Sequence, residues 1–247
     1  MDLIRNPQGE RIDASFAAAS DGSPQRMVDG KAELVVIGHG VTGNKDREWA
    51  VTLAQALNAA GYASLRISFS GNGESEGRFE DSCPSKEVTD LNAVLNACED
   101  WHVTFAGHSM GGAVGVLSAV QDSRIRRLIS LAGMVHTADF AQRKFGDLTP
   151  GRDCMWEKPE CPLSQSFLDD MRSIDSVIDL GAKVSVPWLL VHGSADDVVP
   201  HVESEQISAV AGGDHQLHTL SGSDHVFSGS AASAMAAAVV NWLQAQS

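Results

Sequence analysis

The segment Gly107-His108-Ser109-Met110-Gly111 combines glycine and serine at a spacing that can support nucleophilic chemistry. It follows the apolar run His102–Ala106 and precedes a segment of helical spacing, which predicts Ser109 at a sharp strand-to-helix turn. Gly107 and Gly111 lack the β-carbons that would collide as the chain doubles back. Such a motif also suits a small-residue turn that packs a helix on a sheet. With both flanking elements present, a nucleophilic Ser109 is favoured.

A serine hydroxyl becomes nucleophilic only when a base removes its proton and a third group orients that base. His225 and the pair Asp196 and Asp197 each come just after an apolar run later in the chain. Loops at the carboxyl ends of parallel strands open on one edge of a sheet. The order Ser109, aspartate, His225 is therefore the order expected for a catalytic triad.

The chain holds nine histidines and two candidate acids, so each assignment has rivals. His225 is preferred over His215 and His218 because these two lie before or inside the last predicted strand rather than after it. Asp196 and Asp197 share one loop, and either carboxylate could instead cap a turn. His108 flanks Ser109, but its side chain is expected to point away from that neighbouring residue. The other histidines are expected to serve turns or packing: His39, His192 and His201.

A developing oxyanion needs two N–H donors that are held in place in advance. The N–H of Met110, directly after the nucleophile, is one candidate. The second candidate is the N–H of Val41, in the loop Gly38-His39-Gly40-Val41-Thr42-Gly43 that follows an apolar run. The same glycine-rich loop would also suit an ordinary tight turn.

The elements that must position these residues alternate along the chain. Short apolar runs predict buried strands, and three- and four-residue apolar spacing predicts helices between them. This alternation predicts an α/β fold with a mostly parallel central sheet and helices on both faces. The predicted strands are 33–37, 62–69, 102–106, 128–131, 187–191 and 216–220, and the predicted helices are 49–60, 88–97, 113–120, 202–210 and 231–244.

Two regions depart from the alternation. The tetrad Asn6-Pro7-Gln8-Gly9 predicts an antiparallel N-terminal hairpin with strands at 3–5 and 10–16. Residues 133–186 show no clear buried strand, and a structureless loop of that length is improbable in a compact domain. We therefore expect a small inserted cap with a helix near 164–172, which divides the chain into 1–132, 133–186 and 187–247.

The inserted cap is rich in large apolar side chains. Trp156, Phe140 and Phe145 could form an apolar wall over the site and contact a substrate. The alternative is that these rings only attach the cap to the sheet, since pockets and cores share this composition. Both possibilities stay open at the level of sequence.

The composition excludes several classes of protein. With 18 Lys and Arg against 32 Asp and Glu, the formal net charge of −14 argues against nucleic-acid and anionic-membrane partners. We find no apolar run long enough to span a bilayer and no export signal, so a cytoplasmic protein is expected. The four cysteines match no metal or redox motif and are expected as free thiols, with a bridge between Cys154 and Cys161 possible only after export.

Together these segments resemble the α/β-hydrolase family between about residues 33 and 242, and so imply the α/β-hydrolase fold. In family members with HG-x-x-D-x-x-VP in the acid loop, the aspartate aligned with Asp196 acts, which favours it over Asp197. The loop Phe69-Ser70-Gly71-Asn72-Gly73-Glu74-Ser75-Glu76-Gly77 is similar to that of cinnamoyl and feruloyl esterases and of serine aminopeptidase-like hydrolases. It lacks the aspartate common near positions 68–70, which weakens the subfamily assignment.

The resemblance implies hydrolysis of small or aromatic carboxylic esters through an acyl-enzyme, with no metal or cofactor. Neutral acyl groups are expected to be preferred to polyanionic ones because the chain is acidic. The same residues could instead cleave peptides, amides or thioesters, which parallel assays of p-nitrophenyl esters and aminoacyl anilides would separate. A catalytically silent ligand-binding module is a further alternative, and it would respond to no activated ester.

Overall fold

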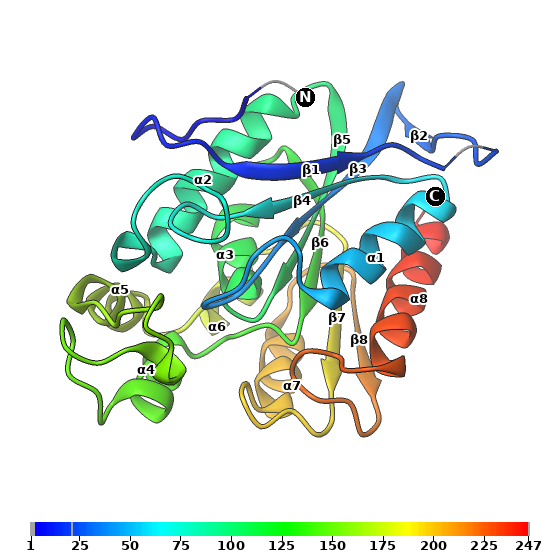
Figure 1. Ribbon diagram of the computed structural model, residues 1–247. Helices are drawn as coiled ribbons and strands as arrows, with labels where there is room; N and C mark the ends of the chain where they lie inside the picture. Colours follow the sequence, from blue (N-terminus) through cyan, green and yellow to red (C-terminus); the bar gives the residue numbers. More distant parts are fainter. Residues whose placement is uncertain (1–2, 21, 247) are drawn as a thin grey trace.

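The computed structural model describes residues 3–20 and 22–246, which build one eight-stranded sheet with helices around it (Figure 1). The strand order is β1-β4-β3-β5-β6-β7-β8, and β2 pairs with β3 beside this path. Strands β3 to β8 run parallel, while β1 and β2 pair antiparallel with β4 and β3. The strands are β1 Asp13–Ala17, β2 Met27–Val28, β3 Lys31–Gly38, β4 Ala63–Ser68, β5 Trp101–His108, β6 Ile125–Leu131, β7 Trp188–Gly193 and β8 His215–Leu220.

Helices cover both faces of the sheet. Helices α1 and α8 lie side by side on one face, and α2 and α3 lie on the other (Figure 1). The helices are α1 Glu48–Ala59, α2 Pro84–Ala97, α3 Met110–Ala119, α4 Thr137–Phe145, α5 Gln165–Ile174, α6 Ile178–Gly181, α7 His201–Val210 and α8 Ser230–Ala245, with short 3₁₀ turns η1 Phe79–Asp81 and η2 Met155–Glu157.

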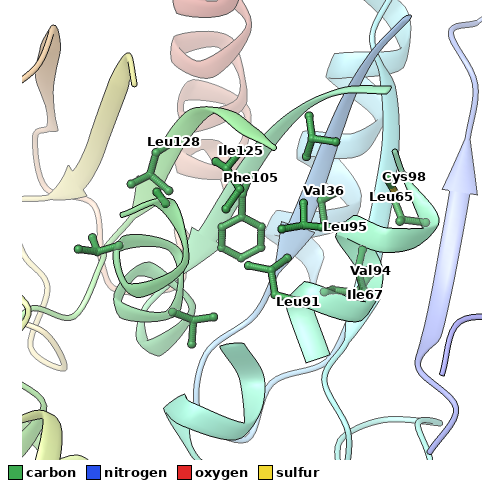
Figure 2. Close-up of a cluster of buried hydrophobic side chains, with 14 of the residues drawn as sticks. Val36, Leu65, Ile67, Leu91, Val94, Leu95, Cys98, Phe105, Ile125 and Leu128 are labelled. Atoms are coloured by element: carbon green, nitrogen blue, oxygen red, sulfur yellow. The ribbon is translucent and has the colours of Figure 1, made fainter. Parts of the chain in front are cut away.

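The buried strands are apolar on both faces because each face has its own hydrophobic core. In β3, Leu34 and Val36 contact the core under α2 and α3, whereas Val35 and Ile37 contact the core under α1 and α8. Figure 2 shows Val36 beside Phe105 and the helix residues of the first of these cores. Side chains alternate across a strand, so a strand covered on both faces reads as a continuous apolar run.

The predicted mostly parallel α/β sheet is confirmed, and the N-terminal region needs a correction. Residue Arg5 forms an isolated antiparallel bridge with Arg11, and the N–H of Ile12 donates to the carbonyl of Ile4 at 3.0 Å, so the hairpin turn exists. No strand forms at residues 3–5, however, and β1 pairs instead with β4, so that β1 is the edge strand of the sheet. A hairpin with so short a ladder is only marginally stable by itself, whereas β4 offers β1 a continuous row of backbone hydrogen-bond partners.

The segment between β6 and β7 contains α4, η2, α5 and α6. The expected helix near 164–172 is α5, whose N-cap Ser164 accepts the N–H of Phe167 at 3.1 Å through its hydroxyl. Helix α4 was not predicted; it packs beside α5 at one end of the sheet (Figure 1). The apolar side chains of the two helices form a third hydrophobic cluster with Met155. The cap boundaries at 133 and 186 stay a prediction.

Two further observations concern membranes and thiols. Among residues 3–20 and 22–246 no helix is long and apolar enough to cross a membrane. All four cysteines are free thiols, so Cys154 and Cys161 are not bridged. Burial raises the pKa of Cys83 and of Cys98 to about 12, so both thiols stay protonated near neutral pH.

Candidate active site

Ser109 occupies the strained turn between β5 and α3 that the sequence predicts. Its backbone has φ 54° and ψ −119°, a conformation that costs a non-glycine residue about 1–3 kcal/mol. The turn is held by a bond from the N–H of Ser109 to the carbonyl of Leu131 and by one from the N–H of Met134 to the carbonyl of Ser109, both 2.9 Å. A β-carbon on Gly107 would lie 2.0 Å from the carbonyl oxygen of Gly111, which explains the glycine there.

The backbone N–H groups of Val41 and Met110 lie near Ser109, and neither has an acceptor within the described chain. Met110 begins α3, where the first N–H groups of a helix have no intrahelical partner. The loop that carries Val41 passes close to the serine, since a β-carbon on Gly40 would lie 2.6 Å from Ser109 Cβ. Their predicted service as oxyanion donors agrees with this placement and stays a prediction.

The imidazole of His39 fixes the backbone of this loop. Its Nε2 accepts the N–H of Phe69 at 3.0 Å, so the proton sits on Nδ1, which donates to the carbonyl of Gly40 at 2.8 Å. Burial lowers the pKa of His39 to about 4, and the ring stays neutral near pH 7. The sequence predicts only a turn or packing role for His39. In the structure its ring also connects this loop to the end of β4.

The structure brings Asp196 to His225 and leaves Asp197 in solvent. The Nδ1 of His225 lies 2.8 Å from Asp196 Oδ2, and the Asp196 side chain is fully buried. The other oxygen, Oδ1, accepts the N–H groups of Val198 and Val199, each at 2.9 Å. Asp197 is exposed, and its backbone carbonyl accepts a hydrogen bond from Lys144 Nζ at 2.9 Å. The acid that the loop offers to the imidazole is Asp196.

A second imidazole, that of His192, contacts the same carboxylate, which sequence reasoning missed. Its Nε2 lies 3.0 Å from both Asp196 Oδ2 and the carbonyl of Val199, and its Nδ1 lies 2.7 Å from Ser204 Oγ. Since both neighbours of Nε2 are acceptors, Nε2 carries the proton. Burial alone would raise the pKa of Asp196, but hydrogen bonds from His192 and His225 outweigh it and hold that pKa below its usual range. The available signal was a histidine four residues before the acid at a strand end.

His108 supports the backbone of His225. Its Nε2 donates to the carbonyl of His225 at 2.8 Å, and its ring stacks on Trp49 with centroids 4.7 Å apart. Burial and the neighbouring His225 lower the pKa of His108 to about 3, so the ring is neutral. The sequence predicts only that His108 points away from Ser109, and the structure shows that its ring binds the backbone of the loop that carries His225.

Ser109 and His225 line the same cavity, with side chains that are both largely buried. Among the described residues no hydrogen bond joins Ser109 Oγ to the His225 ring. In structures without substrate such contacts are often long and tighten in the reacting complex. The structure thus gathers the three predicted side chains at one edge of the sheet, with two of them in direct contact.

The comparisons with known proteins agree with this arrangement. The family model described as "Serine aminopeptidase, S33" matches residues 30–151. The structure of Est1E from Butyrivibrio proteoclasticus with bound ferulic acid is 25% identical, has a TM-score of 0.85, and the match covers 100% of this chain and 99% of that one. The chain has the fold of the α/β-hydrolase superfamily. Within it, the matches support a serine hydrolase.

More distant relatives of this α/β-hydrolase include a thioesterase. Human palmitoyl-protein thioesterase ABHD10, a mitochondrial protein, is 23% identical over 196 residues, which cover 74% of this chain and 63% of that protein. The mouse ABHD10 structure is 17% identical with a TM-score of 0.79, and the match covers 100% of this chain and 99% of that one. The match to the human protein therefore spans less than two thirds of that protein's length. The likeness to the mouse structure concerns the fold alone.

The cavity of this α/β-hydrolase has a volume of about 390 Å³, within the usual range for small-ligand sites. Phe140 and Trp156 lie in its wall, and Trp156 is 40% exposed. Phe145, the third expected substrate contact, is not part of the wall. Its buried ring packs edge-on against the rings of Trp156 and Phe140, with centroid distances of 4.9 Å and 5.9 Å. Phe145 therefore supports these two wall residues without lining the cavity.

Among the described residues no group of three or more His, Cys, Asp or Glu side chains is arranged to hold a metal ion.

Proposed function

We propose that this α/β-hydrolase is a serine carboxylesterase that uses Ser109, His225 and Asp196 as a catalytic triad. The observation that carries the proposal is the 2.8 Å contact between His225 Nδ1 and the buried carboxylate of Asp196, on a cavity that also exposes Ser109. The anionic carboxylate keeps the His225 proton on Nδ1 and leaves Nε2 free to act as a base.

The reaction has two steps. His225 Nε2 removes the hydroxyl proton as Ser109 Oγ attacks the ester carbonyl, and the N–H groups of Val41 and Met110 stabilise the oxyanion. Collapse of the tetrahedral intermediate breaks the bond to the alcohol, which leaves with the proton from His225. Water then attacks the acyl-enzyme by the same route and releases the acid and free Ser109.

The substrate class follows from the cavity. Phe140 and Trp156 provide an apolar wall, and the volume of about 390 Å³ suits a small or aromatic acyl group. The structure of Est1E with bound ferulic acid supports testing a feruloyl ester. We therefore infer small aliphatic and aromatic carboxylic esters as substrates.

The proposal is tested by labelling and turnover together. An organophosphonate should add one mass adduct at Ser109 and abolish hydrolysis of p-nitrophenyl esters. Ser109→Ala should remove both the adduct and the activity while it leaves the melting temperature close to that of the parent protein. No adduct on Ser109 would overturn the nucleophile. Ligand-dependent thermal stabilisation without turnover of any activated ester, including methyl ferulate, would favour a binding module.

Thioester hydrolysis is a second candidate because the curated relatives include a palmitoyl-protein thioesterase. The same triad can attack an acyl thioester, so the geometry of Ser109 does not separate the two activities. Matched butyryl oxygen ester and butyryl thioester substrates should separate them by their kcat/KM values. A thioester preferred by more than 100-fold would transfer the assignment, and an aminoacyl anilide included in the series tests for amide cleavage.

A further inference from the structure

Two cations stand in the cavity wall of an otherwise acidic protein. The chain has a formal net charge of −14, yet the Lys and Arg residues of the cavity, Arg47 and Lys158, outnumber its single carboxylate, that of Glu48. Three buried histidines also line the cavity: His39, His108 and His225. Of these, His39 and His108 are neutral near pH 7. Among the side chains that line the cavity, cations therefore outnumber carboxylates, although the protein as a whole is acidic.

Neither cation is neutralised by a carboxylate. Arg47 donates through Nη2 to the carbonyl of Thr42 at 2.8 Å, and no ion pair involves it in the described part of the chain. Lys158 forms no side-chain hydrogen bond or ion pair within the described residues, and Glu48 pairs with neither of them. The nearby cation Lys45 differs, because its ammonium group lies 2.7 Å from a carboxylate.

Both cations are attached to segments that shape the site. The bond from Arg47 reaches Thr42, the residue after Val41 in the loop beside Ser109. Lys158 comes directly after the 3₁₀ turn η2, which contains Trp156. The N–H of Lys158 donates to the carbonyl of Met155 at 3.1 Å and so closes this turn. Burial and the negative charge of Glu160 raise the pKa of the Cys161 thiol, and the positive charges of Lys158 and Arg47 both lower it.

We propose that Arg47 and Lys158 form an anion subsite, and that the preferred substrates are esters with one carboxylate at the far end of an apolar chain or ring. The inference rests on the proposed esterase function and specifies its substrate class. Phe140 and Trp156 would contact the apolar part while the two cations bind the carboxylate. Charges more than a Debye length of about 8 Å away are largely screened at physiological salt, so the local pair outweighs the net charge. The net charge alone predicts the opposite preference, for neutral esters.

The test compares two esters that differ only in charge: 4-nitrophenyl hydrogen adipate and its methyl ester. The parent protein should show the higher kcat/KM for the anionic ester, and the ratio of the two values should decrease as NaCl is added. Arg47→Gln and Lys158→Gln should each lower that ratio by about 3- to 10-fold, as expected for a partly exposed charge-assisted contact. Since the ratio is measured within one protein, a variant that folds less well still gives an interpretable value.

Arg172→Gln is the matched control. Arg172 lies in α5, is 60% exposed, pairs with Asp169 and does not line the cavity, so this variant changes the net charge equally and should keep the parent ratio. A parent ratio at or below one, or a ratio unchanged in both cavity variants, overturns the subsite while the esterase function stands. If neither ester is hydrolysed and the phosphonate leaves Ser109 unlabelled, the proposed function fails and the subsite inference fails with it.

Discussion

Replacement of Asp196 by asparagine tests the centre of the proposed mechanism. Each carboxylate oxygen of Asp196 accepts two N–H donors: Oδ2 from the rings of His225 and His192, and Oδ1 from Val198 and Val199. An amide group has only one acceptor oxygen, so in either orientation its NH₂ faces two donors. Asp196→Asn therefore removes two acceptor contacts whichever way the side chain turns.

The expected loss follows from those contacts. Hydrogen bonds to a charged group contribute about 1.5–3 kcal/mol each, so two of them correspond to about 3–6 kcal/mol. If the amide turns its NH₂ toward His225, the ring must adopt the wrong tautomer, and this loss falls on the transition state. We expect kcat/KM for p-nitrophenyl butyrate to decrease by about 10²- to 10⁴-fold at pH 7.5.

Asp197→Asn is the matched control, because Asp197 is the neighbouring exposed residue and no hydrogen bond of its side chain is present in the described chain. This variant should retain activity within about threefold of the parent, as expected for an exposed side chain without partners. Thermal unfolding of both variants separates lost catalysis from lost fold. A decrease in Asp197→Asn as large as that in Asp196→Asn, or no decrease in Asp196→Asn, would refute the assignment of the acid.

Three other perturbations have defined outcomes. His39 and His108 are neutral in the folded protein, with pKa values of about 4 and 3 against the ordinary 6.5. Their contribution to stability is therefore complete above pH 6.5 and is lost as the pH falls toward 4. The melting temperature should decrease over that pH range, and it should decrease less steeply in His108→Gln. An equal slope in that variant would contradict this reading. Gly40→Ala should lower kcat/KM by about 100-fold with little change in melting temperature, because the added methyl group would lie 2.6 Å from Ser109 Cβ. Turnover equal to that of the parent would show that the methyl group does not crowd Ser109. Phe145→Ala should lower the free energy of unfolding in urea by about 3–5 kcal/mol through the cavity it leaves, and a cost below 1 kcal/mol would show that the ring supports nothing.

The sequence by itself determined the layered α/β architecture and the place of the proposed nucleophile. Each strand between two helical layers had to be a short apolar run, and β3 and β5 are recognisable for that reason. The turn at Ser109 was also legible, since glycines at 107 and 111 are required by backbone contact alone. The order of serine, acid and histidine followed from the loops that such strands create.

Only the tertiary structure decided how the side chains in the loops are directed. The turn bonds from Val198 and Val199 aim Asp196 inward, and nothing in the residue types distinguishes it from Asp197 without that turn. The contact of His192 with the acid and the position of Phe145 behind the cavity wall likewise depend on neighbours distant in sequence. Periodicity reports which face of an element is buried, whereas the direction of a loop side chain is set by hydrogen bonds and packing that form only when the elements come together.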